Sequence, residues 1–145
     1  MDWIPHVTVA AVICENTRFL LIEEQSDGKI VLNQPAGHWD QNETLLEAAS
    51  REVLEESAWH FEPDAITGIY TYTGMNQITY LRITFAGQHS QFDAQRKLDT
   101  GILRTLWLTR DEVAQAPNLR SPMVLQCIDD YLNNTHYPLN LIQTL

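Results

Sequence analysis

Residues 37–59 read GHWDQNETLLEAASREVLEESAW, and this stretch decides how the rest of the chain is interpreted. From Thr44 to Ser57 it is rich in Leu, Glu and Ala and contains neither Gly nor Pro, which predicts a helix. Thr44 and Glu47 have the spacing of a capping box, in which each side chain satisfies a free amide of the first turn. We expect residues 59–63 to end the helix.

Two faces of this helix differ in chemistry. Residues three and four positions apart are neighbours on a helix, so Glu52, Glu55 and Glu56 crowd one face. A second face, about a third of a turn away, is small and apolar enough to pack on a sheet; it carries Leu46, Ala49, Val53 and Ser57. Between positions 40 and 60 the one Lys or Arg is Arg51. The glutamate face therefore suits a hard divalent cation such as Mg²⁺ or Mn²⁺, with a solvated acidic face as the alternative.

Short apolar segments separated by turn residues flank this helix on both sides. They predict strands at residues 7–13, 18–24, 30–32, 66–73, 78–86 and 102–108. The second of these segments is expected to form a hairpin with the first. The polar residues 88–100 are expected to form a loop.

Two further helices are expected towards the C-terminus. Thr109 and Glu112 repeat the capping-box spacing and predict a short helix. Ser121 as N-cap and Pro122 as first residue predict a last helix, which ends near Asn133. Together, the expected elements form a mixed sheet with two or three helices, an α/β or α+β fold.

The length and charge of the chain limit what it can be. Its 145 residues fit one domain, residues 1–145. Lys and Arg number 9 against 19 Asp and Glu, and the formal net charge of -10 disfavours a nucleic-acid polymer or an anionic membrane as partner. No segment approaches the ~20 apolar residues that span a bilayer, and no basic targeting region is found. Cys14 and Cys127 lie far apart, which favours two free thiols in a cytoplasmic protein over one disulfide in a secreted protein.

The spacing of charges around the helix resembles a known family signature. Gly37, then Glu43 after five residues, then residues 51–56 (Arg-Glu-Val-Leu-Glu-Glu) after seven more match the signature of the Nudix hydrolases at every charged position. Ala58 and Trp59 depart from it, because the family has Gly and an aliphatic residue there. Gly would end the helix in a left-handed turn, which Ala adopts only at a cost of about 1 kcal/mol or more.

Other stretches are similar to the NudJ-like phosphatase subgroup of this family, namely residues 5–10, 33–38, 118–122 and 137–139. The resemblance implies a Nudix-type α/β/α sandwich with a mixed central sheet. It implies that water attacks the phosphoanhydride bond of a small molecule. The implied substrates are nucleoside tri- and diphosphates and the pyrophosphates of thiamine or its hydroxymethylpyrimidine precursor. The oligomeric state is left open between a monomer and a homodimer.

The resemblance also implies a metal site on the helix. Glu52, Glu55 and Glu56 are expected to hold Mg²⁺, with Mn²⁺ as an alternative ion. The carbonyl oxygen of Gly37 is expected to join them, because a residue without Cβ lets the backbone approach a ligand. Glu52 is the preferred general base. Three other acids remain alternatives for that role: Glu55, Asp93 and Asp99.

Four further residues receive expected roles. Arg51 is expected to orient a glutamate, either Glu52 or Glu43, although Glu43 is also a suitable first-turn acid for the helix dipole. His38 and Trp39 follow Gly37 and are expected beside the phosphates, where Trp39 either stacks on a substrate ring or only covers the loop.

Arg120, next to the last helix, is the fourth of these residues. It is expected to hold a terminal phosphate together with the free amides of that helix, and an ordinary helix-start arginine is the alternative. The five histidines are scattered along the sequence and predict no metal set. Two other functions stay open: a catalytically silent Nudix domain that senses a nucleotide metabolite, and an acidic structural domain without a ligand.

Overall fold

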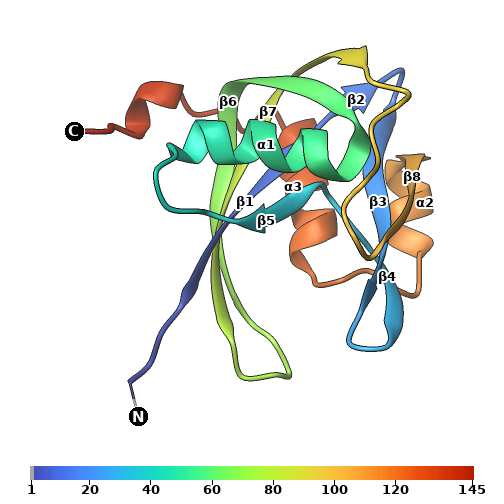
Figure 1. The fold of residues 1–145 in the computed structure, drawn as a ribbon, viewed down its shortest axis with the longest axis horizontal. Helices are drawn as coiled ribbons and strands as arrows, with labels where there is room; N and C mark the ends of the chain where they lie inside the picture. The colour runs from blue at the N-terminus through green and yellow to red at the C-terminus, as the bar shows by residue number, and fades with distance from the viewer. Residues whose placement is uncertain (1) are drawn as a thin grey trace.

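The computed structural model describes residues 2–145. Its strands are β1 (His6–Val12), β2 (Cys14–Glu15), β3 (Arg18–Ser26), β4 (Lys29–Asn33), β5 (Ala36–His38), β6 (Trp59–Thr73), β7 (Thr79–Phe92) and β8 (Ile102–Thr109). Its helices are α1 (Leu45–Ser57), α2 (Arg110–Gln115) and α3 (Met123–Leu132), followed by a 3₁₀ turn at Leu139–Leu141 (Figure 1). Within the described residues, none of these helices has the length and apolar character needed to cross a membrane.

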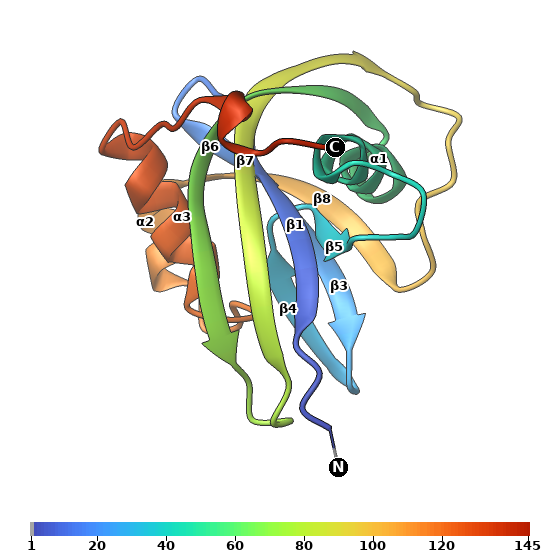
Figure 2. The same ribbon diagram turned by 90° about the vertical axis from the view of Figure 1, so that its left-hand side faces the viewer.

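The strands form two sheets between layers of helices. The first sheet has the order β5-β1-β7-β6 and is mixed, because β1 and β7 are parallel whereas the other pairs are antiparallel. In the second sheet β3 pairs with β2, β4 and β8, all antiparallel. Helix α1 lies on one side of the sheets, and α2 and α3 lie on the other (Figure 2). The predicted mixed α/β/α architecture is confirmed, with its sheet divided in two.

Helix α1 forms as the sequence predicts. Thr44 is its N-cap, and both hydrogen bonds of the capping box with Glu47 are present. Ala49 and Val53 are fully buried against the first sheet. The helix ends at Ala58, which adopts the left-handed conformation with φ 64° and ψ 11°. An alanine therefore takes the conformation that the family signature gives to glycine, and the predicted helix end is confirmed.

The predicted hairpin between residues 7–13 and 18–24 is wrong. β1 is paired with β5 and β7 in the first sheet, whereas β3 is paired with the short strand β2. The chain leaves the first sheet after Ile13, which is buried in the core, and only the Leu20 amide, donating to the Ile13 carbonyl, links the two segments. Both segments are apolar enough for either sheet, so the sequence does not separate the two pairings.

The predicted loop at residues 88–100 is shorter than expected. β7 continues to Phe92, because β6 begins at Trp59, directly after α1, and supplies it with a partner. The irregular segment is confined to residues 93–101. Helix α3 begins at Met123, one residue later than predicted, with Pro122 as its N-cap. The hydroxyl of Ser121, the predicted N-cap, still accepts a hydrogen bond from the Met123 amide.

Candidate active site

A cavity of about 660 Å³ opens between α1, the first sheet and the β3–β4 hairpin. The side chains around it combine carboxylates, cations and aromatic rings; among them are Thr8, Glu24, Asn33, Gly37, His38, Glu52, Glu56, Tyr72, Tyr80, Arg82 and Arg120. Five of these were predicted from the sequence: Gly37, His38, Glu52, Glu56 and Arg120. The other predicted site residues, Trp39, Arg51 and Glu55, lie beside the cavity and do not line it.

Glu52 reaches the cavity because Gly37 has no side chain. A Cβ atom built on Gly37 would overlap the Glu52 carboxyl group. Burial raises the pKa of Glu52 to about 7, although the hydrogen bond from Arg51 acts in the opposite direction. The carboxyl group of Glu52 is therefore a group that can exchange a proton near neutral pH.

Glu56 lies deeper than Glu52. Its carboxylate accepts a hydrogen bond from the Ala36 amide at 2.8 Å. Burial raises the pKa of Glu56 to about 9, and the neighbouring charges of Glu52, Glu24 and Asp99 add to the increase. The negative charge of Glu56 is therefore unfavourable in the folded protein unless the carboxylate binds a proton or a metal ion.

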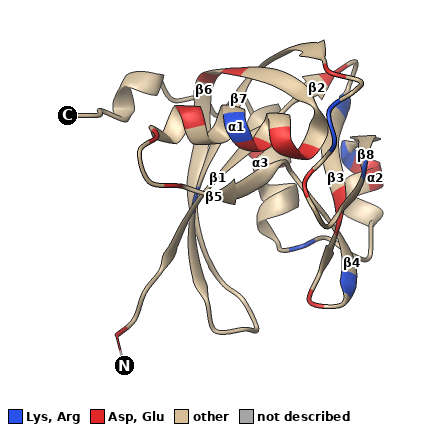
Figure 3. Ribbon diagram, in the orientation of Figure 1, with Lys and Arg blue, Asp and Glu red and all other residues tan. Residues whose placement is uncertain are grey.

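Arg51 organises the acidic face of α1, where it is the one blue segment among red ones (Figure 3). Its Nε and Nη2 atoms donate to the two oxygens of Glu43 at 2.9 and 2.8 Å. Its Nη1 atom donates to both Glu52 and Glu55, at 2.8 and 3.1 Å. The hydrogen bonds from Arg51 lower the pKa of Glu43. Arg51 thus contacts both glutamates that the sequence proposed as its partners, and Glu55 in addition.

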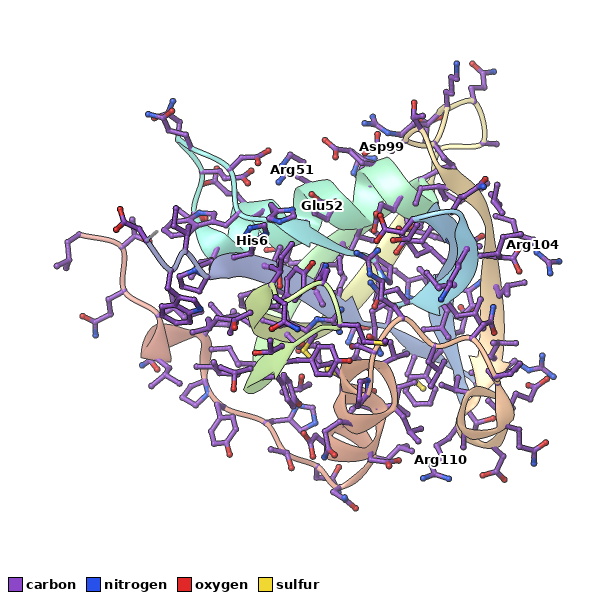
Figure 4. The ribbon with its side chains drawn as sticks, turned by 90° about the horizontal axis from the view of Figure 1, so that it is seen from below. His6, Arg51, Glu52, Asp99, Arg104 and Arg110 are labelled. Carbon is purple, nitrogen blue, oxygen red and sulfur yellow. The ribbon has the colours of Figure 1, made fainter. Side chains whose placement is uncertain are left out.

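Glu55 faces outwards from the cavity. Its backbone carbonyl accepts a hydrogen bond from the Asp99 amide at 3.0 Å, and burial, with the nearby charge of Asp99, raises the pKa of its carboxyl group. Arg51, Glu52 and Asp99 lie on the same side of the molecule in Figure 4. Asp93, the other predicted loop acid, instead accepts a hydrogen bond from the Gln95 amide within its own turn. Its amide donates to the Ala58 carbonyl at the end of α1.

The three helix glutamates do not by themselves form a metal cage. Among residues 2–145 no three His, Cys, Asp or Glu side chains are arranged so that they could hold a metal ion. Glu52 and Glu56 face the cavity, whereas Glu55 turns towards Arg51 and Asp99. Two buried carboxylates with raised pKa values still fit a divalent cation of the Mg²⁺ type, which keeps several water ligands.

The backbone of β5 adds a polar edge to this site. The bonds from the Ala11 amide to the Pro35 carbonyl and from the Trp39 amide to the Val7 carbonyl flank the Val9–Gly37 pair. Alternation along an antiparallel ladder makes Val9 and Gly37 a hydrogen-bonded pair, so the Gly37 carbonyl faces β1. The backbone groups of Ala36 and His38 face α1 instead, where they meet Glu56 and Arg51. The carbonyl group that faces α1 beside Glu56 is therefore that of Ala36, and not that of Gly37.

The remaining predicted residues have identifiable partners. The indole N–H of Trp39 donates to the Glu43 carbonyl, and the side chain is 47% exposed outside the cavity lining, which fits the covering of the loop. Arg120 lies at the cavity and donates to Glu24 at 2.8 Å. His38 lies 3.0 Å from His6, ring nitrogen to ring nitrogen. Burial, and then the charge of His6, lower the pKa of His38. The scattered histidines thus include one contacting pair.

Sequence reasoning missed three prominent cavity residues. Tyr72 and Tyr80 are cross-strand partners on β6 and β7, and Arg82 lies two residues further along β7. The available signal was the polar Arg82 between apolar neighbours in a predicted strand. Alternation of polar and apolar residues is typical of a strand with one solvated face, so this signal pointed to solvent and not to a cavity.

Comparison with known proteins identifies the family. A model of the NUDIX domain matches residues 4–126. The chain belongs to the Nudix family. It is 38% identical over 138 residues to Phosphatase NudJ of Escherichia coli (strain K12), which covers 95% of this chain and 90% of that protein. The resemblance to the NudJ-like subgroup is therefore confirmed. As a Nudix hydrolase, the protein acts on phosphoanhydride bonds, and Nudix hydrolases generally use divalent metal ions.

Solved structures agree with this family. A NUDIX hydrolase from Nitrosomonas europaea is 50% identical, with a TM-score of 0.95 over 98% of both chains. The NUDIX domain of Shewanella oneidensis NrtR, complexed with ADP ribose, has a TM-score of 0.74 over 92% of this chain and 90% of that chain. At 15% identity it shows the fold alone. The prediction that residues 1–145 form a single domain stays a prediction, since the family model matches only 4–126.

Proposed function

We propose that this Nudix hydrolase is a Mg²⁺-dependent pyrophosphohydrolase of small phosphorylated molecules, with Mn²⁺ as an alternative ion. One observation carries the proposal. Glu52 and Glu56 are two buried carboxylates at one cavity, and both have a raised pKa. Carboxylates held so close together favour a cation between them and a polyanionic substrate.

Glu52 and Glu56 would hold the metal from α1, with the Ala36 carbonyl as a backbone ligand in place of the expected Gly37 carbonyl. Glu55 remains a proposed third ligand: its carboxylate shares an Arg51 nitrogen with Glu52, and it would join the metal only after its side chain turns from Arg51 towards the cavity. When bound, the metal would offset phosphate charge and acidify a water molecule. This neutralisation explains how a protein with a net charge of -10 accepts a polyanion.

Glu52 is the proposed general base. Its carboxylate lies at the cavity, next to the site proposed for the metal and its water, which suits a group that takes a proton from that water. Arg51 is a positioning residue, since it holds Glu52 and Glu55 in place without lining the cavity. Glu55 and Asp99 remain alternative bases, whereas the Asp93 carboxylate accepts a hydrogen bond within its own turn.

The proposed substrates are nucleoside tri- and diphosphates and the pyrophosphates of thiamine or hydroxymethylpyrimidine. A cavity of about 660 Å³ has the size of a small-molecule site. His38 and Arg120 line it and are proposed to bind phosphate, whereas Trp39 is proposed to cover the neighbouring loop. We further propose a cytoplasmic protein, since Cys14 and Cys127 are both free thiols. A monomer and a homodimer both remain open as its assembly.

A panel of these pyrophosphates, incubated with and without Mg²⁺ while released phosphate is measured, tests the proposal. Glu56→Gln should lower Mg²⁺-dependent turnover roughly 100-fold or more, because it removes a metal ligand and not merely its support. Glu62→Gln, an exposed glutamate on β6, is the matched control and should leave turnover unchanged. Equal activity of wild type and Glu56→Gln would overturn the metal site. Binding without turnover would support the nucleotide-sensing alternative instead.

A further inference from the structure

The floor of the cavity contains a buried arginine that the proposed metal chemistry does not use. Arg82 lies near the start of β7, which runs between β1 and β6, and it lines the cavity. Its side chain is almost wholly removed from solvent, since the residue is only 3% exposed. A charged residue is rarely this buried unless it is paired with an opposite charge.

The partners of Arg82 inside the protein are neutral. Its Nη1 atom donates to the Gln34 side-chain oxygen and its Nη2 atom to the Asn33 side-chain oxygen, both at 2.9 Å. A long contact of 3.9 Å joins Nη1 to the Cys127 sulfur. In the part of the chain that the structure describes, no carboxylate forms an ion pair with Arg82. The positive charge of Arg82 is thus hydrogen-bonded to two neutral amide side chains and is not paired with a negative charge.

Other arginines of the same chain show what Arg82 lacks. Arg51, Arg104 and Arg110 each present the Nε and Nη2 atoms to a single carboxylate, those of Glu43, Glu23 and Asp129 respectively. This edge of a guanidinium group matches the two oxygens of an oxyanion. In Arg82 the Nε atom is buried without a partner and Nη2 meets only the amide of Asn33. Of the buried side-chain nitrogens and oxygens in residues 2–145, Arg82 Nε is the one left unsatisfied.

An unpaired buried charge destabilises a folded protein, so a chain keeps it where something else makes use of it. The cavity provides the access. Glu52 and Glu56 occupy the wall formed by α1, and Arg82 occupies the sheet, so cationic and anionic groups face one space. The hydroxyl of Thr8, the neighbour of Arg82 on β1, also lines that space and adds a neutral donor.

We propose that Arg82 is a substrate-binding residue, whose guanidinium group binds a phosphate oxygen of the substrate on the sheet side of the cavity. The inference rests on the proposed function, which supplies the pyrophosphate substrate and the metal on the opposite wall. The substrate's anionic group supplies the opposite charge that Arg82 lacks within the protein. Arg82 therefore contributes affinity for the phosphate group, whereas the acids of α1 carry the proposed cleavage.

Two substitutions test this role. Arg82→Met removes the charge and keeps the length of the side chain. Asn33→Asp keeps the size of its side chain but gives Arg82 a carboxylate partner within the protein. Both should raise the substrate KM by about 10- to 100-fold, the effect of losing a charge-assisted hydrogen bond. Asn33→Asp should also raise the unfolding midpoint of the ligand-free protein, because it pairs a buried charge. Arg110→Met, outside the cavity, is the matched control and should leave KM unchanged.

Binding of the non-hydrolysable imidodiphosphate with Mg²⁺, measured by calorimetry at a temperature at which the variants remain folded, separates this role from catalysis. The dissociation constant should rise about 10- to 100-fold in Arg82→Met and Asn33→Asp and recover partly in Arg82→Lys. If Arg82→Met does not fold, Asn33→Asp decides. Unchanged imidodiphosphate binding in the folded variants, with a lower unfolding midpoint only, would show a purely structural arginine and overturn the proposal. A wild type that binds imidodiphosphate but cleaves no pyrophosphate would refute the proposed function and leave Arg82 as an anion-binding residue.

Discussion

Arg82 lines the cavity and Arg51 lies beside it, and the protein surrounds these two arginines in opposite ways. Arg51 is partly exposed and is hydrogen-bonded to the carboxylates of Glu43, Glu52 and Glu55. Arg82 is buried and meets only the side-chain oxygens of two amides, with its Nε atom unsatisfied. The charge of Arg51 is thus neutralised within the fold, by the acids proposed to act in catalysis. The charge of Arg82 has no such partner in the protein, and we have proposed that a ligand neutralises it.

Substitution of Arg51 is expected to have the largest effect on this contrast. Arg51→Met leaves Glu43, Glu52 and Glu55 without their shared cation, so their mutual repulsion should disorder the acidic face of α1. We expect kcat to fall by roughly 100-fold or more and the unfolding midpoint to fall as well. Steady-state kinetics and thermal unfolding, followed by circular dichroism, measure both. Arg51→Lys should be intermediate, because an ammonium group cannot reproduce the two-point contact with Glu43. A rise in KM alone would contradict the positioning role.

Gly37→Ala should disturb the acidic residues of α1 while leaving Arg82 in place. The new Cβ overlaps the position of the Glu52 carboxyl group and should displace it from the cavity. We expect kcat to fall about 10- to 100-fold, with a smaller effect on imidodiphosphate binding. The double variant Gly37→Ala/Glu52→Ala provides the control, since removal of the displaced side chain should restore stability but not activity. Unaltered kcat in Gly37→Ala would contradict the close approach of Gly37 to Glu52.

The pH dependence of stability tests the burial of Glu56, on the acidic side of the cavity, without any ligand. The pKa of Glu56 is raised from its ordinary value of 4.5 to about 9, mainly by burial. Between these values the unfolded chain has released a proton that the folded protein retains, so stability should fall as pH rises. In a metal chelator, the unfolding midpoint of wild type should drop by several degrees from pH 5 to pH 9. Glu56→Gln should flatten this profile whereas Glu62→Gln should not, and Mg²⁺ should oppose the loss in wild type. Parallel profiles for wild type and Glu56→Gln would contradict the burial of this carboxyl group.

The smallest expected effect is at the end of α1. Ala58 has a φ of 64°, a conformation that costs a residue with a Cβ about 1 kcal/mol and glycine almost nothing. Ala58→Gly should therefore increase the free energy of unfolding by only about 0.5 kcal/mol, after the greater flexibility of glycine in the unfolded chain is subtracted. Chemical denaturation measures this change. The kcat and KM values should stay unchanged, and any shift in either would show that the helix end controls the glutamates.

The parts of the molecule that the sequence predicts well are those with local causes. The cap at Thr44, the apolar face of α1 and the spacing of its glutamates depend on residues a few positions apart, and the structure confirms the helix. The partners of Arg82 are 45 to 49 positions away in sequence, Asn33 and Gln34 at the end of β4 and Cys127 in α3. No periodicity connects them, so the cavity floor could not be predicted.

The acidic site itself shows the same division. Helical spacing predicts that Glu52, Glu55 and Glu56 are neighbours, but it does not predict which of them the nearby Arg51 turns away from the cavity. That outcome depends on the reach of Arg51 and on the position of Asp99, which belongs to a loop more than forty residues later. The lack of a Cβ atom at Gly37 correctly indicated a close approach at this position, which Glu52 makes. The direction of the Gly37 carbonyl depends on the register of β5 against β1, which the sequence does not give.

The exposed segment 93–101 illustrates a different constraint. Two of its amides, those of Asp93 and Asp99, donate to the carbonyls of Ala58 and Glu55 at the end of α1. Helix carbonyls in this position have no partner within the helix and need one from elsewhere. The segment is therefore tied to α1 at both ends, and its length cannot change without loss of one of these bonds. In related proteins, insertions and deletions should accumulate in the β6–β7 turn, whereas residues 93–101, which connect β7 to β8, should keep their number.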